Sequence, residues 1–316
     1  MKFEKLRFHP KLDDKIFMTL IAVLVIYAIV QSITATQYYY LGFLSNVLIF
    51  GIFALAYNLL HGYTGLLSFG HAGFFIIGAY GGALAMSNAS NNVWLGFLGS
   101  LGISAAFAFV TGFFSVRSRG IYFALLTLAF GMLPFLAINS PLRRLTGGSM
   151  GWHLIYAPPF FFDLSNKLLF FLFTVGISIA VYVILRIMIN SPFGQSLKGI
   201  RDNELKLEGL GYNTRRLKYT AVTISGAISG VAGYLYLLLN LSISPSIGGY
   251  FISAKVIFVS LIGGVSGLVG PLLGTFVWFL IDEFLVAPGF LELTLGITLA
   301  VVILRFPGGI MGIFKK

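Results

Sequence analysis

Residues 62–80 read GYTGLLSFGHAGFFIIGAY and are the most informative stretch of this chain. Glycine recurs through the stretch among aliphatic and aromatic side chains. In a bilayer, glycine either lets helices pack closely or lets the backbone unwind where protein or water can satisfy its polar groups. The sequence leaves both readings open: tight helix packing, or unwound backbone that lines a path for a solute.

The composition around this stretch is that of a membrane protein. The 316 residues are 58% hydrophobic and only 10% charged, with a mean hydropathy of +0.93, whereas a soluble domain carries about 25% charge. Runs of the length that crosses a bilayer predict an all-α, polytopic membrane protein with about ten transmembrane helices. We expect these helices near residues 17–34, 41–60, 66–86, 95–115, 121–139, 168–189, 219–239, 252–265, 270–285 and 290–305.

The basic residues predict the orientation of these helices. With the N-terminus inside, 17 of the 21 Lys and Arg residues fall on the cytoplasmic side, and positive charge resists translocation. We therefore expect both termini to be cytoplasmic, with residues 1–16 as a cytoplasmic segment and an uncleaved first helix in one transmembrane domain, residues 17–316. The net charge of +11 is scattered at the ends of apolar runs, which argues against nucleic acid as a partner.

Metal, thiol and cofactor chemistry find no support in the sequence. The chain has no cysteine, and its four histidines lack the HExxH spacing of a zinc site. We expect no metal and no cofactor. His71, which precedes Ala72 and Gly73, is expected to be a packing or hydrogen-bonded histidine rather than a catalytic base.

The longest internal polar segment, residues 190–218, is expected to form an inner loop with a short amphipathic helix. Ser191 can cap a helix that has Pro192 at its first position, and Asp202 or Asn203 can cap a second short helix that Gly211 stops. An amphipathic element facing the cytoplasm buries its apolar stripe against lipid, its own protein or a partner. We favour a partner, contacted by Phe193, Leu197 and Ile200.

Four motifs in order resemble a known family. Residues 193–204 read FGQSLKGIRDNE, residues 119–131 read RGIYFALLTLAFG, residues 243–274 contain ISP, GG and GP, and residues 306–312 read FPGGIMG. Together with residues 62–80, these are similar to the branched-chain amino acid ABC transporter permeases of the LivM type. The resemblance runs from about residue 58 to the C-terminus. Gln195, where the family usually has arginine, and Lys206, Leu207 and Gly209, where it often has alanine, depart from the pattern and put the details of a partner contact in doubt.

The resemblance implies a permease domain in the plasma (inner) membrane of a prokaryote, not an enzyme. Its partners would be a second permease, which the resemblance favours as a paralogue, two cytoplasmic ATP-binding subunits and an external substrate-binding protein. The chain contains no GxxxxGK[ST] nucleotide loop, which agrees with ATP hydrolysis on separate subunits. Coupling to the ATP-binding subunits is expected from Phe193, Gly194, Leu197, Ile200, Arg201, Glu204 and Gly211.

Two further groups of residues are predicted to be functional. Thr64-Gly65-Leu66 and Ser266-Gly267-Leu268 form a weak internal echo at cytoplasmic turns. We expect the translocation path to involve Thr64, Gly65, Ser68, Ser266 and Gly267. On the outer side, Arg143 and Arg144 resist the inward bias of positive charge, and we expect them to dock acidic residues of the binding protein.

The substrate remains open at this stage. The resemblance indicates leucine, isoleucine and valine, yet similar permeases move urea, amides or other small solutes. An ion-coupled secondary carrier is a weaker alternative, because the acids near the expected spans, Asp282, Glu283 and Glu292, fall near outer ends rather than at the midplane. A passive channel is disfavoured by the inner loop, and an intramembrane enzyme by the lack of a catalytic constellation at membrane depth.

Overall fold

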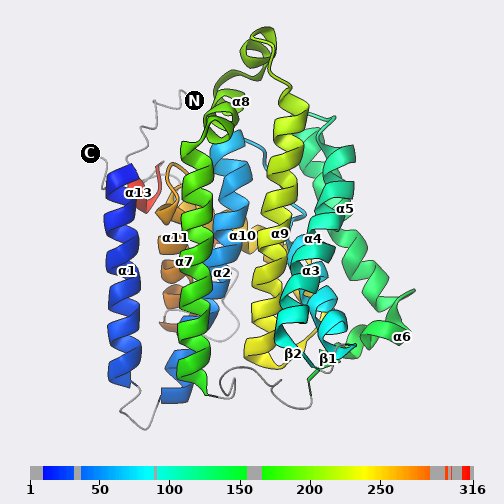
Figure 1. Cartoon of the computed structure of the whole chain (residues 1–316), viewed down its shortest axis with the longest axis vertical. Coiled ribbons are helices and arrows are strands. Elements are labelled where there is room, and N and C mark those ends of the chain that lie inside the picture. Colours follow the sequence, from blue (N-terminus) through cyan, green and yellow to red (C-terminus); the bar gives the residue numbers. More distant parts are fainter. Residues whose placement is uncertain are drawn as a thin grey trace.

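The computed structural model describes residues 10–31, 37–88, 91–154, 166–284, 296–297, 300 and 308–313. These form a bundle of helices with one two-stranded antiparallel sheet at an end (Figure 1). In chain order the elements are α1 (Pro10–Gln31), α2 (Gln37–Thr64), α3 (His71–Ser87), α4 (Val93–Ser115), α5 (Ile121–Asn139), α6 (Arg143–Thr146), η1 (Gly148–Met150), β1 (Trp152–His153), α7 (Lys167–Asn190), α8 (Pro192–Gly209), α9 (Thr214–Asn240), β2 (Ser242–Ile243), η2 (Pro245–Gly248), α10 (Tyr250–Gly263), α11 (Val269–Phe284) and α13 (Ile310–Ile313).

The all-α, polytopic class predicted from the sequence is confirmed. Among the described residues, five helices are long and apolar enough to cross a membrane: residues 39–64 of α2, and α4, α5, α7 and α9. The shorter helices α3 and α10 are also apolar. The tenth expected span, residues 290–305, lies outside the described residues except for residues 296–297 and 300.

The two ends of the bundle differ in what they carry. The start of α1, the short helix α13 and the long excursion α8 lie at one end, and α6 lies with the β1–β2 sheet at the other (Figure 1). In the sheet, Trp152 is opposite Ile243 and His153 is opposite Ser242. We call these the α8 end and the sheet end.

The centre of the bundle is formed by α2 and α9. The most apolar window of α2 is 89% buried and that of α9 is 78% buried, whereas the windows of α4 and α5 are only 28% and 33% buried. The outward faces of α4 and α5 consist of large apolar side chains such as Phe109, Phe113, Leu125 and Leu133. This is the pattern expected of a helix that faces lipid or a second membrane subunit.

Small residues let the central helices approach closely. A Cβ added at Gly78 of α3 would lie 2.1 Å from the Cα of Gly230 on α9, which is the close backbone contact that small residues allow between membrane helices. Tyr234 of α9 then fixes α4, because its hydroxyl donates to the carbonyl of Val93 at 3.0 Å. Gly78, in the glycine-rich stretch, therefore serves close helix packing.

Candidate functional site

The chain unwinds between α2 and α3. Gly65 has φ +73°, a conformation that glycine adopts without strain, and α3 starts only at His71. Residues 65–70 are therefore not helical, whereas the sequence predicted a span from residue 66. Most residues of this stretch are apolar, so the apolar pattern alone did not show that the helix starts at His71 rather than at residue 66.

The break lies at membrane depth. The hydroxyl of Ser225 on α9 donates to the carbonyl of Ala56 at 2.5 Å and lies 3.0 Å from Nε2 of His71. His71 is thus level with Ala56, eight residues before the end of α2, or roughly 12 Å along its axis. The buried His71 is a hydrogen-bonded packing residue, as predicted.

Hydroxyl side chains support the unwound backbone. The N–H of Phe69 donates to Oγ1 of Thr127 on α5 at 3.2 Å, and the N–H of Ala72 donates to Oγ of Ser253 on α10 at 3.0 Å. Non-helical backbone at membrane depth requires such internal partners. Thr127 and Ser253 come from distant helices, so sequence reasoning did not find them.

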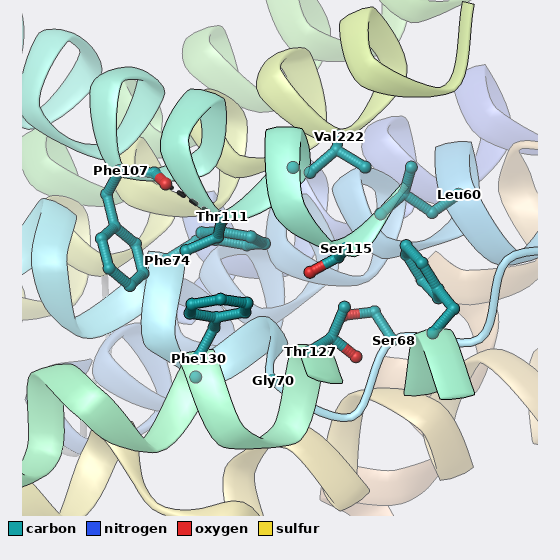
Figure 2. A pocket seen from close by; sticks show the side chains of 13 residues that line it. Leu60, Ser68, Gly70, Phe74, Phe107, Thr111, Ser115, Thr127, Phe130 and Val222 are labelled. Atoms are coloured by element: carbon teal, nitrogen blue, oxygen red, sulfur yellow. Dashed lines mark hydrogen bonds between the residues drawn. The ribbon is translucent and has the colours of Figure 1, made fainter. Parts of the chain in front are cut away.

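A small cavity lies beside this break (Figure 2). Its volume is about 10 Å³, and the rings of Phe74, Phe107 and Phe130 lie on one side of it while the hydroxyls of Ser68, Ser115 and Thr127 lie on the other. Among the described residues, Oγ of Ser68 and Oγ of Ser115 are buried without a hydrogen-bond partner. A single water needs about this volume and polar partners of this kind, whereas an amino acid does not fit. The cavity is closed to solutes in this conformation.

Backbone contacts between glycines close the cavity. A Cβ added at Gly70 would lie 1.7 Å from the carbonyl oxygen of Thr127, and one at Gly73 would lie 2.7 Å from the Cα of Gly131. The break and α5 therefore touch backbone to backbone. The most apolar window of α5 is only 33% buried.

The two turns that echo each other in sequence meet in space. Nδ2 of the buried Asn58 on α2 donates to the carbonyl of Gly267 at 2.9 Å. A Cβ added at Gly62 would lie 2.6 Å from the carbonyl of Val265. The turns are therefore joined directly, and the signal that reasoning from sequence missed was Asn58, an amide inside an apolar helix.

The predicted path residues occupy different surroundings. Ser68 lines the cavity. Thr64 is buried, and its hydroxyl donates to the carbonyl of Leu60 at 2.6 Å. Gly65 is exposed beside α8, whereas Ser266 and Gly267 are buried in the turn before α11. Of the five, the structure brings only Ser68 to a cavity lined by hydroxyls.

Helix α8 starts as predicted, but its apolar stripe faces its own protein. Pro192 is in the first turn, and Gly194 is required because a Cβ there would lie 2.3 Å from the carbonyl of Ile189. Leu197 is 0% and Ile200 5% exposed, and Phe193 packs partly against the same core. The expectation that this stripe faces a partner differs from the structure, because periodicity identifies the apolar side of a helix and not what covers it.

Arg201 joins α8 to the end of α2. Its Nη1 donates to the carbonyl of Gly62 at 2.7 Å, an acceptor in the last turn of α2 that the helix itself leaves unused. Gly65 lies against the same side chain, since a Cβ there would be 3.1 Å from Cγ of Arg201. The helix expected to couple to partners thus contacts the break directly.

The second half of α8 is held by charged groups. The backbone kinks at Asn203, whose Oδ1 accepts from the N–H of Lys206 at 3.0 Å, so Asn203 is the predicted cap. Nζ of the buried Lys218 lies 2.5 Å from Oε1 of Glu204. The outer segment of α8 is therefore tied to the start of α9.

Glu208 adds a second tie at the same place. The Thr214 hydroxyl donates to Oε1 of Glu208 at 2.7 Å, and Nη2 of Arg119 lies 3.3 Å from the same oxygen. The Thr214 hydrogen bond, with the charges of Arg119 and Lys218, holds the pKa of Glu208 below its ordinary value. Glu208 is therefore ionised when the tie is formed.

The tip of α8 leaves apolar side chains uncovered by the described residues. Leu205 is 66%, Leu210 68% and Tyr212 50% exposed, on both sides of Gly211 with φ +87°. Figure 1 shows this tip as the part of the chain farthest from the bundle. An exposed apolar surface of this kind is a candidate interaction site.

Arg143 and Arg144 lie on the short exposed helix α6 near the sheet end (Figure 1). Gly148 packs closely against Arg143, because a Cβ added at Gly148 would lie 2.5 Å from Cγ of Arg143. The aromatic segment that follows in the same loop, residues 155–165, lies outside the described residues.

Lys255 is a cation that lies among aromatic rings inside the bundle. It lies on α10, with Nζ 4.2 Å from the ring centre of Phe279 and 4.6 Å from that of Phe50. A cation over aromatic faces is stabilised by the ring quadrupole. Lys255 therefore fastens α10 to α2 and α11.

Comparison with known proteins identifies the family. The family described as "Branched-chain amino acid transport system / permease component" matches residues 39–305, which include the break, α8 and the turn before α11. No solved structure is significantly similar to the chain.

Individual relatives agree. The "High-affinity branched-chain amino acid transport system permease protein LivM" of Escherichia coli (strain K12) is 32% identical, over 69% of this chain and 57% of the relative. The protein of the same name from Salmonella typhimurium is 31% identical over the same shares, and a "Probable branched-chain amino acid transport permease protein LivM" of Methanocaldococcus jannaschii is 33% identical over 21% of this chain and 19% of its own length. The chain thus matches about 57% of the length of its first two relatives. From the match over residues 39–305, this chain belongs to the family of permease components of branched-chain amino acid transport systems.

Proposed function

We propose that this chain is a membrane permease subunit of a binding-protein-dependent ABC importer for leucine, isoleucine and valine. It spans the plasma (inner) membrane of a prokaryote with its α8 end and both termini in the cytoplasm. The distribution of Lys and Arg and the family membership support this assignment. The partners are a second permease, by resemblance a paralogue, two ATP-binding subunits and an external binding protein.

The hydrogen bond from Arg201 to Gly62 carries this proposal. This hydrogen bond connects α8 to the end of α2, next to the non-helical residues 65–70. A displacement of α8 therefore reaches the break through one strong, charge-assisted contact. This is the mechanical requirement for a channel that separate ATP-binding subunits drive.

Different parts of α8 have different tasks in this mechanism. Leu205, Leu210 and Tyr212 at the tip contact the ATP-binding subunit. Phe193, Gly194, Leu197 and Ile200 hold the first half of α8 against this chain. Glu204 and Gly211 fix the second half, through Lys218 and through the turn into α9.

The path for the solute runs beside the break. Ser68 and the hydroxyls around it supply hydrogen bonds to the ammonium and carboxylate of a passing amino acid, and the phenylalanine rings accept its aliphatic side chain. Thr64, Gly65, Ser266 and Gly267 lie at the cytoplasmic mouth of this path. Opening separates α5 from residues 65–70.

Uptake by the reconstituted complex tests the assignment. In proteoliposomes that contain all partners, labelled leucine should enter only when ATP is present on the side of the membrane on which α8 lies. Unlabelled isoleucine and valine should compete, and urea should not. Uptake that needs no ATP and follows an imposed proton or sodium gradient would instead identify a secondary carrier.

The tip of α8 can be tested separately. Leu205→Asp and Leu210→Asp place a charge in an apolar contact, which costs about 2 kcal/mol or more when the contact is dry. We expect about a thirtyfold loss of ATP-driven uptake with unchanged membrane insertion. The matched controls are Leu205→Met and Leu210→Met, which keep an apolar side chain at the same exposed positions. Equal uptake by the Asp variants and the Met variants excludes the tip as the contact.

Arg143 and Arg144 are proposed to dock the binding protein. Both are exposed and lie at the end of the bundle opposite α8. Changing both to Glu should raise the binding-protein concentration needed for half-maximal uptake at low salt, and the difference should shrink at high salt because exposed charges are screened. An unchanged concentration dependence at low salt removes these residues from the docking surface.

A further inference from the structure

A second, larger pocket opens at the α8 end, away from the cavity beside the break. Its volume is about 240 Å³. Its walls come from elements that are far apart in sequence: the start of α1, the ends of α2 and α7, the first turns of α8 and the turn before α11. None of the residues assigned above to coupling, path or docking lines it.

The pocket carries charges of both signs. Arg186 and Lys198 face it from α7 and α8, and Asp13 faces it from α1. Asp13 is fixed by a hydrogen bond that its Oδ2 accepts from the N–H of Leu268 at 3.3 Å. The amides of Asn190 and Gln195 add further donors and acceptors.

Arg186 can take an anionic ligand in addition to its present partner, and Nζ of Lys198 lies 5.9 Å from the ring centre of Tyr63. Arg186 forms an ion pair with Asp14, which also accepts from the Tyr182 hydroxyl at 3.0 Å. A guanidinium has five N–H donors, so one carboxylate does not exhaust it. Burial, with the charge of Arg201, lowers the pKa of Lys198, so a carboxylate beside Lys198 would stabilise its charged form.

The combination selects against singly charged ligands. A simple anion would be repelled by Asp13, and a simple cation by Arg186 and Lys198. A molecule with a carboxylate and an ammonium group a few bonds apart matches both. The rings of Tyr63 and Tyr182, with Leu268, provide apolar contacts for an aliphatic side chain. The volume of about 240 Å³ is large enough for a small solute.

We propose that this pocket binds a free α-amino acid from the side of the membrane on which α8 lies, and that the bound amino acid restrains α8. The pocket is built on both α7 and α8, so an occupant bridges the bundle to the first turns of the moving helix. For an importer, the amino acid on this side is the transported product. The choice of leucine as ligand, and the regulatory effect, rest on the proposed function.

Binding is tested on the full chain in nanodiscs of phosphatidylglycerol, a lipid without an ammonium group. Leucine should bind saturably. Its two singly charged analogues, 4-methylpentanoate and 3-methylbutylamine, should each bind at least about tenfold more weakly, since each lacks one charge-assisted contact. Equal binding of an analogue overturns the proposal, and so does the absence of saturable leucine binding.

Variants locate the site. Lys198→Gln and Arg186→Gln should each weaken leucine binding by about tenfold or more, while Lys206→Gln, an exposed lysine of α8 outside the pocket, should not change it. Because Arg186→Gln also breaks an ion pair, Asn190→Trp, which fills the pocket, serves as an independent variant. Unchanged binding in Lys198→Gln and Asn190→Trp overturns the location. Loss of leucine binding when phosphatidylethanolamine replaces phosphatidylglycerol would assign the pocket to a lipid headgroup and overturn a soluble ligand.

Regulation is measured in the reconstituted complex. Leucine on the α8 side should suppress ATP hydrolysis, and Lys198→Gln should raise the half-inhibitory concentration about tenfold. Equal suppression in wild type and Lys198→Gln contradicts the regulatory role. The binding assay needs neither ATP nor partners, so failure of ATP-driven uptake would refute the proposed function and leave the pocket still testable.

Discussion

The two glycine turns of this protein start from similar sequences and reach different structures. Residues 62–67 read GYTGLL and residues 264–269 read GVSGLV, and both follow a helix that ends at the α8 side. After the first turn, residues 65–70 stay unwound beside hydroxyl groups. After the second, the chain turns at once into α11, and a Cβ added at Gly263 would lie 1.7 Å from the carbonyl of Gly270.

The difference lies in the partners rather than in the glycines. At the first turn, Thr127 and Ser253 take up backbone N–H groups. At the second, glycine backbones pack on one another: an added Cβ at Gly274 would lie 2.0 Å from the carbonyl of Val259. Glycine alone therefore does not distinguish a supported helix break from a dry joint.

The largest effect should come from filling the dry joint. In Gly263→Ala the new methyl would overlap the backbone carbonyl of Gly270, which is held in a packed turn. We expect a loss of about 3 kcal/mol in the free energy of unfolding. Thermal unfolding of the purified chain in detergent measures it. The control is Gly176→Ala on α7, where nothing lies within 4 Å of an added Cβ. Similar unfolding temperatures for the two variants would remove the contrast between the turns.

A smaller effect is expected from removing the support of the break. Thr127→Val leaves the N–H of Phe69 buried without its acceptor, which should cost about 1–3 kcal/mol. Thr111→Val is the matched control, because Thr111 lines the same cavity but its hydroxyl bonds only to carbonyls of its own helix, at 3.0 Å for Phe107. Unfolding midpoints of the two variants should differ. Equal losses would mean that the hydroxyl of Thr127 does not hold the break.

Accessibility separates the turns without changing stability. With no native cysteine in the chain, single cysteines at Ser68, Thr64 and Ser266 can be labelled with a polar thiol reagent. Ser68→Cys should react at a rate that changes with ATP and with loaded binding protein, since its cavity is closed in the conformation described here. Ser266→Cys, at the cytoplasmic mouth of the path, should react more slowly than Ser68→Cys when the path is open, because glycine backbone packs tightly around its turn. A Ser68→Cys that never reacts would place the first turn with the second, as packing only.

The smallest change in stability is expected at the contact between the turns. Asn58→Leu removes the donor to Gly267 but also removes the buried Oδ1, which has no partner among the described residues. These effects offset each other, so the loss should stay near 1 kcal/mol or below. The number of leucine molecules imported per ATP hydrolysed should nevertheless fall, because the turns are no longer joined. An unchanged ratio would show that they move independently.

Much of the bundle could be predicted from the sequence. The spans expected at residues 95–115, 121–139 and 168–189 coincide with α4, α5 and α7 within a few residues, because long apolar runs have few other solutions in a bilayer. The cap at Asn203 and the stop at Gly211 were also predicted. These are local signals, carried by residues that act within one turn of the chain.

The site could be predicted only in part. The start of α3 at His71 depends on Thr127 and Ser253, which no local pattern connects with residues 65–70. Burial of Leu197 was not predicted, because an apolar stripe on α8 is the same in sequence whether its own protein or another covers it. Contacts between distant helices decide both, and a single sequence does not record them.

The starting point of α3 has an electrical consequence. The first turn of a helix carries a partial positive charge equivalent to roughly half a unit. In α3 the N–H of Ala72 in this turn donates to Oγ of Ser253, and the N-cap residue Gly70 makes no side-chain hydrogen bond. Because this turn lies at membrane depth, its field acts in a medium of low dielectric constant, where it is screened little. Backbone amides do not titrate, so this positive potential beside Ser68 is the same at every physiological pH. It changes only when the helix itself is displaced.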